Sequence, residues 1–308
     1  MAVDVSIILV SWNTRDLLLA CLESLPAAIG DLRADVWVVD NASRDDSVAA
    51  VRSRYAHVRL IENRTNLGFA AANNQAIRGG AGRYVLLLNS DTVAAPDSIE
   101  LLVRFADDHP RVGAVGGQLL NADGSFQASR ARFPSLWSET LNVTGLGRRL
   151  YGPWYPGYGP RHSRHPCRAD VLPGACMLVR RAAIEQVGPM DEDYFMYSEE
   201  TDWCLRLHRA GWELWYLPDA RILHHGGQST QQAREPMIAA LYRSKVRFFR
   251  KHYGPLHAAL LQLIFVLVLR AKWIAQRHTG RMRRPIGWRD LSAPVTHHHQ
   301  PSLIDGRS

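Results

Sequence analysis

The sequence predicts an α/β fold with a mostly parallel central sheet, flanking helices and a helical, basic C-terminal tail. Short aliphatic runs alternate with helical patterns over residues 5–91, and polar residues directly follow several of these runs. Such buried runs separated by helices are typical of parallel sheets. With 46% hydrophobic and 21% charged residues among 308, the composition is that of a globular protein and excludes a disordered one.

The individual elements follow from these patterns in order. We expect strands at residues 5–10, 36–39, 58–61 and 84–88, separated by helices at residues 14–25, 45–51 and 68–77. Further along, the pattern predicts a strand at 171–179, a helix opened by acids at 199–210, and short strands at 214–217 and 221–223. Residues 121–170 lose periodicity and are rich in Gly, Pro, Arg, Tyr and Trp, so we expect a functional loop there.

Charge is distributed unevenly along the chain. Residues 1–236 hold 24 basic and 27 acidic side chains, whereas residues 237–289 hold 12 basic and no acidic ones. A nucleic-acid-binding protein would carry its positive charge on the folded body, so we expect no nucleic acid partner. The change in composition predicts an α/β domain at residues 1–235 and a helical, basic extension at residues 236–308.

The N-terminus and the cysteines predict a cytoplasmic protein. The segment MAVDVSIILVSWN lacks a positive n-region and is interpreted as a first strand, not as a signal peptide. The four cysteines form no CxxC pair, which indicates reduced thiols. The longest apolar stretch, residues 256–269, is shorter than the roughly 20 residues that cross a bilayer as a helix.

Polar clusters follow three of the predicted strands, at the sheet edge where ligands bind in parallel sheets. They are Ser11-Trp12-Asn13, Asp40-Asn41 and Asn89-Ser90-Asp91. Asp91 is either a ligand for Mg²⁺ or Mn²⁺ bridging phosphate oxygens or part of a turn. Asp40 either accepts hydrogen bonds from a nucleobase or ribose or caps the following helix.

A glycine turn and small residues open the helix expected after the third strand. This segment holds Asn66, Gly68, Asn73 and Asn74. Small residues permit the close approach of a ligand, or of another backbone in tight helix–sheet packing. The segment is neither GxGxxG nor a Walker loop, which argues against dinucleotide redox chemistry and P-loop hydrolysis.

Two further groups of residues could take part in catalysis or binding. Glu199, Glu200 and Asp202 place three carboxylates within four positions. Adjacent carboxylates raise one another's pKa, which suits a general base, although acids are also favoured at a helix N-terminus. His224 ends an apolar run before two glycines, a setting that suits a metal or phosphate. HxH spacing is absent, so we expect no zinc site.

The ordered set of motifs resembles the family-2 glycosyltransferases with the GT-A fold, in particular the bacterial rhamnosyltransferase-like branch that builds cell-wall and surface polysaccharides. The resemblance covers residues 3–249. It rests on VSIILVSWN, VWVVDNASRDDS, ENRTNLGFAAANN, YVLLLNSDT, PGACMLVRR, FMYSEETDWCLRLHRAGW and ILHHGGQS.

The resemblance implies a role for each matching residue. Asp91 and His224 would hold the metal, Glu200 would be the catalytic base, and Glu199 and Asp202 would orient the acceptor or the helix. The nucleotide would be bound by Ser11, Trp12, Asn13, Asp40, Asn66, Gly68, Asn73, Asn74 and Asn89. Asn89 stands where the family's DxD motif has its first aspartate, so Asp91 must bear most of the metal coordination.

The implied activity is inverting transfer of a sugar, with rhamnose favoured, from a nucleoside-diphosphate sugar. The acceptor would be a hydroxyl of a glycan or of a polyprenyl-diphosphate-linked sugar, and Mg²⁺ or Mn²⁺ would be the cofactor. One alternative is a catalytically weak or dead sugar-nucleotide-binding scaffold, favoured by Asn89 alone. A nucleotidyltransferase would need a Gly-rich and basic loop after the first strand, where this chain has Ser11-Trp12-Asn13-Thr14.

The tail predicts association with a membrane surface. Residues 237–250 have an amphipathic helical pattern, and the following apolar run is flanked by Lys272, Arg277, Arg281, Arg283 and Arg284. A basic and apolar segment suits an interfacial anchor, here on the cytoplasmic face of the inner membrane. The alternatives are helices packed on the body or forming a homodimer interface.

Overall fold

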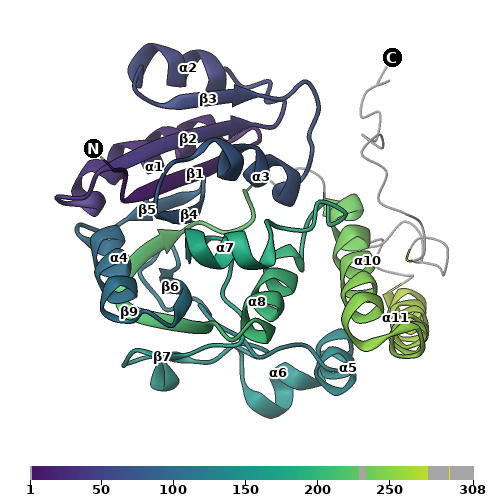
Figure 1. The fold of residues 1–308 in the computed structure, drawn as a ribbon. Coiled ribbons are helices and arrows are strands. Elements are labelled where there is room, and N and C mark those ends of the chain that lie inside the picture. The colour runs from purple at the N-terminus through teal and green to yellow at the C-terminus, as the bar shows by residue number, and fades with distance from the viewer. Residues whose placement is uncertain (1, 229–233, 277–290, 292–308) are drawn as a thin grey trace, which may run out of the picture.

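The computed structural model describes residues 2–228, 234–276 and 291, and its centre is a single mixed sheet (Figure 1). The strands are β1 (Val5–Ser11), β2 (Ala34–Asp40), β3 (Arg59–Glu62), β4 (Tyr84–Asn89), β5 (Thr92–Ala94), β6 (Val112–Leu120), β7 (Cys167–Arg168), β8 (Cys176–Arg180) and β9 (Glu213–His224). They lie in the order β3-β2-β1-β4-β8-β6-β9-β5, and β7 pairs with β9.

Helices cover both faces of this sheet, because its strands alternate apolar side chains between two cores. The helices are α1 (Arg15–Ile29), α2 (Ser47–Arg54), α3 (Phe69–Gly79), α4 (Ser98–Asp108), α7 (Arg181–Val187) and α8 (Glu199–Arg209). Ile7 of β1 packs in a core with α1, α2 and α4, and its neighbour Ile8 in a core with α3, α7 and α8. This alternation is the period of two that a strand requires.

The predicted fold class is confirmed, with helices on both faces of a central sheet. Strands β3, β2, β1 and β4 are parallel as expected. The remainder of the sheet is mixed, since β8 runs antiparallel to both β4 and β6. The two short strands expected at residues 214–217 and 221–223 are a single strand, β9, with a register shift opposite Gly117 and Gln118 of β6. Within residues 171–179, regular strand begins only at Cys176.

The segment expected to be a loop at residues 121–170 contains regular structure. It forms α5 (Leu136–Thr144), α6 (Leu146–Tyr151), a short 3₁₀ turn at Pro160–His162 and β7. Helix α5 begins at a capping box in which Ser135 and Ser138 exchange hydrogen bonds. The expectation of an irregular loop is therefore wrong for much of this segment, because two short helices give little periodic signal.

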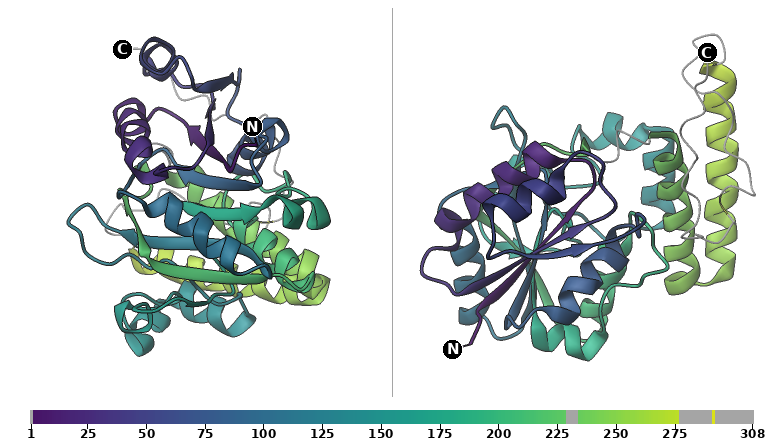
Figure 2. Two further views of the ribbon diagram at one scale, coloured as in Figure 1. Left: turned by 60° about the vertical axis from the view of Figure 1, so that its left-hand side comes forward. Right: turned by 90° about the horizontal axis from the view of Figure 1, so that it is seen from above.

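The C-terminal helices pack on the body instead of standing apart from it. They are α10 (Arg234–Tyr253) and α11 (Pro255–Gln276), which lie side by side at one end of the molecule (Figure 2). Phe248 and Phe249 of α10 and Phe265 of α11 share a core with Tyr194 and with Leu205 of α8. The boundary expected at residue 235 thus falls in the first turn of a helix that shares its core with the body.

Several basic residues of α10 are used in ion pairs with the body. Lys245 Nζ lies 2.5 Å from a carboxylate oxygen of Glu139 in α5, and Lys251 Nζ lies 2.7 Å from oxygens of both Asp191 and Asp202. Arg247 pairs with Asp191. Part of the positive charge of residues 237–289 is therefore neutralised by acids of the α/β body, and these ion pairs hold α10 against the body. Arg277, Arg281, Arg283 and Arg284 lie outside the described residues.

Helix α11 is longer than the apolar run that the sequence suggests. Residues 255–275 form a helical segment whose most apolar 18 residues have a mean hydropathy of 1.9, which meets the length and composition of a membrane span. The expectation that this stretch is too short is therefore wrong, because the helix continues through Trp273 beyond Leu269. One third of its most apolar window is buried against the rest of the protein.

Asp202 provides a test of how α10 is held. Its buried carboxylate accepts hydrogen bonds from Arg206 Nε at 2.8 Å and from His252 Nε2 at 2.7 Å, beside Lys251. We expect Asp202→Asn to lower the free energy of unfolding by about 2–3 kcal/mol, less than for a fully buried pair because Lys251 and Arg206 are partly exposed.

The measurement is urea denaturation of the full-length protein at pH 7. The matched control is Asp193→Asn, since Asp193 pairs with Arg247 but has a side chain that is 69% exposed, and its loss should change the unfolding free energy by less than about 0.5 kcal/mol. Equal effects of the two substitutions would contradict the role assigned to Asp202.

Candidate active site

The register of the sheet brings the predicted polar clusters to one edge. Ser11 at the end of β1 pairs with Asp40 at the end of β2, and Val10 pairs with Asn89 at the end of β4. In the antiparallel pair of β5 and β9, Thr92 lies opposite His224. The polar residues after the strands therefore meet although they are far apart in sequence.

Asp91 and His224 form the centre of this edge. His224 Nε2 lies 3.3 Å from Asp91 Oδ1 and 3.3 Å from Asn89 Nδ2, and the other ring nitrogen lies 2.7 Å from Gln127 Oε1. Burial alone would raise the pKa of Asp91, but the hydrogen bond and charge of His224 outweigh it and hold that pKa below its usual range. Asp91 is thus an ionised carboxylate that is largely buried.

These side chains fit a divalent cation that also binds phosphate. In the described ranges, His, Cys, Asp and Glu side chains form no group of three that could enclose a metal by themselves. Mg²⁺ and Mn²⁺ commonly take one or two carboxylates and complete their coordination with substrate phosphates. Asp91 supplies such a carboxylate, and Asn89 and His224 supply the neighbouring polar atoms.

Asp40 has one oxygen ready for a ligand. Its Oδ2 accepts a hydrogen bond from the backbone N–H of Ser43 at 2.9 Å. Its Oδ1 is buried and has no hydrogen-bond partner within the structure, and a buried acceptor without a partner is costly. The orphaned oxygen suits an N–H or O–H of a ligand. Trp12 lies half-buried after the paired end of β1.

Other residues of the predicted nucleotide set hold the loops together. The side chain of Ser11 is buried and lies 3.1 Å from the Thr14 hydroxyl, which is 3.0 Å from that of Ser90. Asn13 Oδ1 accepts a hydrogen bond from the N–H of Arg44 at 2.7 Å. These contacts tie the ends of β1, β2 and β4 to one another, so Ser11 and Asn13 position the edge of the sheet.

The start of α3 is fixed by backbone contacts. Asn66 Oδ1 accepts a hydrogen bond from the N–H of Gly68 at 2.9 Å. Gly68 has φ +81°, and a Cβ added there would lie 2.1 Å from the carbonyl oxygen of Phe195. Asn73 donates to Phe69 O, a helical turn back. The glycine therefore lets the loop before α8 lie directly on the start of α3.

Asn74 and Asn41 complete this scaffold. The fully buried Asn74 donates to Met190 O at 2.8 Å and accepts from Met190 N–H at 3.1 Å. Asn41, which sequence reasoning did not assign, donates to Gly68 O at 3.0 Å and accepts from Asn63 Nδ2 at 2.9 Å. Its position directly after Asp40, which ends β2, is the sequence feature that could have identified Asn41 as part of the site.

Glu199 and Glu200 open α8 after an unusual turn. Tyr197 and Ser198 both have positive φ, +69° and +66°, and such backbone strain in residues other than glycine is concentrated at functional sites. Burial raises the pKa of Glu200, and burial together with the charge of Glu200 raises the pKa of Glu199 well above its usual value. Both glutamates therefore keep their protons to a higher pH than an exposed glutamate does.

The two glutamates have different surroundings. Glu200 lines a pocket of about 660 Å³, whereas Glu199 is 3% exposed and its Oε2 is buried without a partner. Gln127, which holds His224, lines the same pocket. Asp91 and His224 do not line the pocket themselves, so Gln127 is the residue that links its wall to the Asp91–His224 pair. Gln127 was missed by the sequence reasoning because it lies in the aperiodic segment.

The structure does not place Asp202 at this pocket. Its carboxylate is fully buried and faces Arg206, Lys251 and His252. Despite burial, hydrogen bonds to His252 and Lys251 and the charge of Arg206 hold the pKa of Asp202 far below its usual range. Of the two roles predicted for Asp202, orienting the acceptor or the helix, this geometry favours the second, because the residue anchors α8 to α10.

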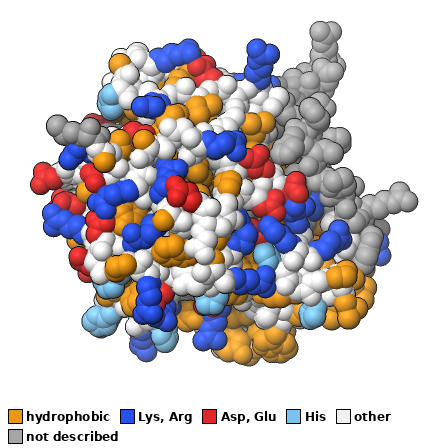
Figure 3. Space-filling model, in the orientation of Figure 1, with side chains coloured by type: hydrophobic (Ala, Val, Ile, Leu, Met, Phe, Trp, Pro, Cys, Tyr) orange, Lys and Arg blue, Asp and Glu red, His pale blue; other side chains and the backbone are white. Residues whose placement is uncertain are grey.

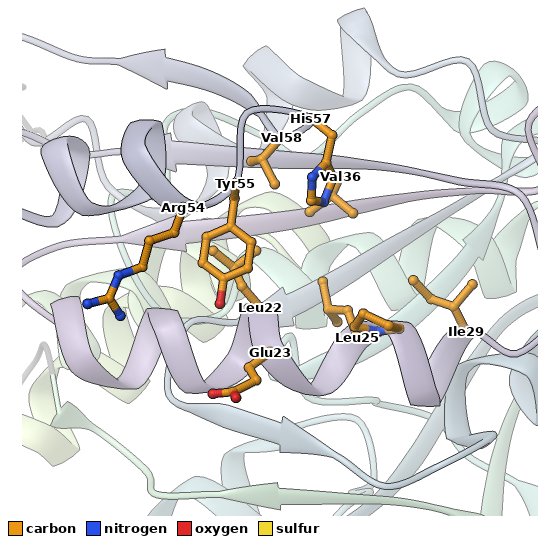
Figure 4. A pocket seen from close by; sticks show the side chains of 10 residues that line it. Leu22, Glu23, Leu25, Ile29, Val36, Arg54, Tyr55, His57 and Val58 are labelled. Carbon is orange, nitrogen blue, oxygen red and sulfur yellow. The ribbon is translucent and has the colours of Figure 1, made fainter.

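A second hollow, of about 450 Å³, lies between α1, β2 and the end of α2 (Figure 4). Leu22 and Leu25 of α1 and Tyr55 and His57 after α2 line it. None of the residues predicted from sequence for the nucleotide, the metal or catalysis lines this hollow. It is a shallow apolar depression on the face opposite α3 and α8.

The fold and the site define a class of protein. The α/β sheet carries an orphaned acid at the end of β2, an ionised Asp91 after β4 and His224 at the end of β9, with a glutamate on the nearby pocket. This arrangement suits an enzyme that uses a nucleotide-linked substrate. The comparison with known families agrees, since the profile of glycosyl transferase family 2 matches residues 6–188. The chain belongs to glycosyl transferase family 2, as its motifs predicted.

Two relatives are rhamnosyltransferases. N-acetylglucosaminyl-diphospho-decaprenol L-rhamnosyltransferase of Mycobacterium tuberculosis is 34% identical over 267 residues, which cover 82% of this chain and 78% of that protein. Rhamnosyltransferase WbbL of Escherichia coli is 28% identical over 235 residues, which cover 72% of this chain and 83% of that protein. The predicted rhamnosyltransferase-like branch is thereby confirmed.

Solved structures share the GT-A fold. A mannosyltransferase from Pyrobaculum calidifontis, in complex with GDP-Man and Mn²⁺, has a TM-score of 0.57 and 19% identity, with 92% of this chain and 77% of that chain covered. GalNAc-T7 with UDP, GalNAc and Mn²⁺ has a TM-score of 0.59 and 15% identity, with 81% and 48% covered. At these identities the likeness bears on the fold alone.

The contact between Gly68 and Phe195 can be tested against a glycine of similar backbone. Gly124 has φ +77° but nothing within 4 Å of an added Cβ. We expect Gly124→Ala to lower the free energy of unfolding by about 1 kcal/mol, the cost of the left-handed backbone. Gly68→Ala should lower it by about 3 kcal/mol, because overpacking adds about 1–3 kcal/mol.

Chemical denaturation of both variants measures the difference. If the two alanine variants were equally stable, the close approach of the α8 loop to α3 would be refuted.

Proposed function

We propose that the protein is an inverting, metal-dependent rhamnosyltransferase that acts on a polyprenyl-diphosphate-linked sugar. The observation that carries the proposal is the shared pocket. Glu200 lines it, and so does Gln127, which orients His224 beside Asp91. A base and a diphosphate-binding edge on one pocket are what a single displacement at a sugar carbon requires.

The donor would lie along the edge of the sheet. The orphaned Oδ1 of Asp40 would accept a hydrogen bond from the nucleobase or ribose. Asp91 would be the principal ligand of Mg²⁺ or Mn²⁺, with His224 and Asn89 beside it. When bound, the cation would neutralise charge on the diphosphate leaving group. Ser11, Asn13, Asn73 and Asn74 would support this surface through their structural hydrogen bonds.

Glu200 would act as the general base. It would take the proton of an acceptor hydroxyl, whose oxygen attacks the anomeric carbon from the face opposite the nucleoside diphosphate. The new glycosidic bond forms as the bond to the diphosphate breaks, so one displacement inverts the configuration. Glu199, whose pKa is raised further, would stay protonated and buried behind Glu200, and thus would not compete for the proton.

The donor sugar and the acceptor are inferred from the relatives. The Mycobacterium tuberculosis relative is named for transfer of L-rhamnose to N-acetylglucosaminyl-diphospho-decaprenol, and the Escherichia coli relative is also named a rhamnosyltransferase. Transfer of this kind belongs to the synthesis of cell-wall or surface polysaccharide. A scaffold without activity is disfavoured, because the chain keeps both Asp91, paired with His224, and Glu200, which lines the pocket.

Glu200→Gln tests the base directly. We expect turnover to fall by about 10²–10⁴-fold, the usual contribution of a general base, while nucleotide binding persists because Asp40 and Asp91 are unchanged. Transfer should be assayed with a panel of dTDP-, UDP- and GDP-sugars, and binding of the released nucleotide by calorimetry. Glu185→Gln, on the exposed part of α7, is the control. Wild-type turnover in Glu200→Gln would exclude Glu200 as the base.

The pH dependence follows from the same group. A base works only when it is ionised, so activity should fall as pH decreases through the raised pKa of Glu200. The acid limb of kcat/KM should therefore have its midpoint above the value of 4.5 for an ordinary glutamate. A midpoint at or below that value would contradict the assignment.

The acceptor's lipid would be reached from an apolar face. In the described part of the chain, every exposed large hydrophobic side chain lies within residues 137–154 or 256–274. The apolar face consists of Trp137, Leu146, Leu150, Tyr151 and Trp154 together with Leu256, Leu260, Leu263, Leu267 and Ile274. Helix α11 contacts α5, which contacts α6. Figure 3 shows hydrophobic side chains gathered low on the molecule, where Figure 1 places these helices.

This face would lie on the cytoplasmic surface of a membrane. Its leucines on α11 follow spacings of four and three residues, so they form one stripe, while Leu261 and Phe265 face the core. A helix buried on one side and apolar on the other suits the interfacial position more than a span. The exposed Arg148, Arg149 and Arg270 beside it would be attracted to anionic headgroups.

Vesicle flotation tests this placement. We expect the full-length protein to float with anionic phosphatidylglycerol vesicles, and Leu260→Ser with Leu267→Ser to weaken binding at least tenfold, because both leucines are exposed and their burial would be lost. The matched control is Leu260→Met with Leu267→Met, which keeps the face apolar.

Sedimentation of the same variants distinguishes a membrane surface from a second copy of the chain as the partner of the apolar face. If the serine variant floated like the wild type but changed from dimer to monomer, the face would be a homodimer interface and the membrane placement would be wrong.

A further inference from the structure

The pocket that contains Glu200 carries more positive charge than catalysis requires. Arg130, Arg132, Arg148 and Lys245 line it, against the carboxylates of Glu139 and Glu200. Lys245 and Glu139 lie 2.5 Å apart and neutralise each other. Three guanidinium groups and one ionised glutamate remain, which leaves the pocket with a surplus of two positive charges. The surplus of two applies when Glu200 is ionised, since a protonated Glu200 would leave three positive charges.

The three arginines have no carboxylate partner of their own. In the ranges that the structure describes, none of them lies within 4.0 Å of an Asp or Glu oxygen. Arg130 donates to His162 O at 2.7 Å and lies over the Tyr158 ring, and its Nε is buried without a hydrogen-bond partner. Arg132 donates to the Tyr158 hydroxyl at 2.6 Å. Neutral partners orient these cations but leave their charge uncompensated.

The three arginines come from the segment between β6 and β7. Arg148 lies on α6, and Arg130 and Arg132 lie before α5. The Asp91–His224 pair of the donor edge follows β4 and ends β9. The arginines and that edge are thus contributed by different elements, with Glu200 lining the pocket that the arginines share. The pocket wall also reaches α5 and α6, which carry part of the apolar face.

We infer that Arg130, Arg132 and Arg148 form a second diphosphate-binding site, which holds the diphosphate of the lipid-linked acceptor. A diphosphate joined to a sugar and to a lipid carries one negative charge on each phosphate, which matches the surplus of two. Arginine binds phosphate oxygens through its planar fork of N–H donors. This inference rests on the proposed function and names the group that distinguishes its acceptor.

The arrangement assigns each part of the acceptor a place. The sugar hydroxyl would reach Glu200, the diphosphate would lie on the arginines, and the lipid would leave along α5 and α6 towards the apolar face. The donor diphosphate would stay beside Asp91 and His224. The arginine site would therefore affect recognition of the acceptor and leave donor binding unchanged.

Binding of inorganic pyrophosphate to the full-length protein tests the site without any knowledge of donor or acceptor. The titration is done in EDTA, so that no cation can hold pyrophosphate at Asp91. We expect binding to weaken about tenfold in Arg148→Gln, since a charge-assisted hydrogen bond is lost. Arg149→Gln is the matched control: Arg149 is exposed on the same helix and does not line the pocket.

Unchanged pyrophosphate binding in Arg148→Gln would overturn the inference. An equal loss in Arg149→Gln would overturn it as well, because attraction would then depend on overall charge instead of on the pocket. Because Arg148 is exposed, we do not expect its substitution to impair folding. Thermal unfolding of both variants checks this.

Steady-state kinetics separates this inference from the proposed function. With an N-acetylglucosaminyl-diphospho-lipid acceptor, Arg148→Gln should raise the acceptor KM about tenfold and leave the donor KM unchanged. With N-acetylglucosamine on an uncharged alkyl chain, the variant and the wild type should have equal kcat/KM. A rise in donor KM, or an equal loss with both acceptors, would refute the arginine site while the transferase function stands.

If the wild type bound pyrophosphate through Arg148 but transferred sugar to no acceptor, the anion site would stand and the proposed function would fail.

Discussion

The buried carboxylate of Asp202 is the contact on which the arrangement of the site depends. It lies in the first turn of α8 and holds Arg206 of the same helix together with Lys251 and His252 of α10. Lys251 also reaches Asp191 in the loop before α8. One ionised group thus joins the loop, α8 and the C-terminal helices. It stays charged because hydrogen bonds from His252 and Lys251 and the charge of Arg206 offset its burial.

The position of Glu199 and Glu200 follows from this anchor. The loop before α8 is held by the Asp202 cluster and by its contact with Gly68. Gly68 has no side chain, so Phe195 of the loop can lie against it, and its carbonyl accepts a hydrogen bond from Asn41. Two residues of left-handed backbone then turn Glu199 inwards and leave Glu200 on the pocket. Because α10 contributes Lys245 and Phe248 to the pocket wall, the C-terminal helices complete the site as well as offering an apolar face.

The sequence contained enough to predict the edge of the sheet. Asp40, Asn89 and Asp91 were found because strand ends in a parallel sheet align. The register places Asp40 and Asn89 opposite adjacent residues of β1, and Asp91 follows two residues after Asn89. Ser11 and Asn74 were assigned to the nucleotide by the resemblance to the family, yet their polar atoms bond to other parts of this chain. Asp202 was grouped with the catalytic acids by spacing, whereas only the position of α10 shows which way its carboxylate faces.

Other features lay beyond a reading of patterns. Helices α5 and α6 are too short for periodicity to reveal, so Gln127 and the arginines near them had no predicted place. Helix α4, by contrast, could have been predicted but was not. Its apolar residues follow helical spacing, at Ile99, Leu102, Val103 and Ala106. The basic tail was interpreted as a surface feature, but charge counts cannot tell that Lys245, Arg247 and Lys251 pair with acids of the body.

The central claim is that one glutamate and one diphosphate edge on a shared pocket perform a single displacement. It is tested most directly by the stereochemistry of the product. The full-length protein is incubated with an N-acetylglucosaminyl-diphospho-lipid and each donor of the nucleotide-sugar panel, and the anomeric configuration of the product is determined by NMR. The account predicts a rhamnosyl product whose configuration is inverted relative to the donor. A product that retains the donor's configuration would contradict it.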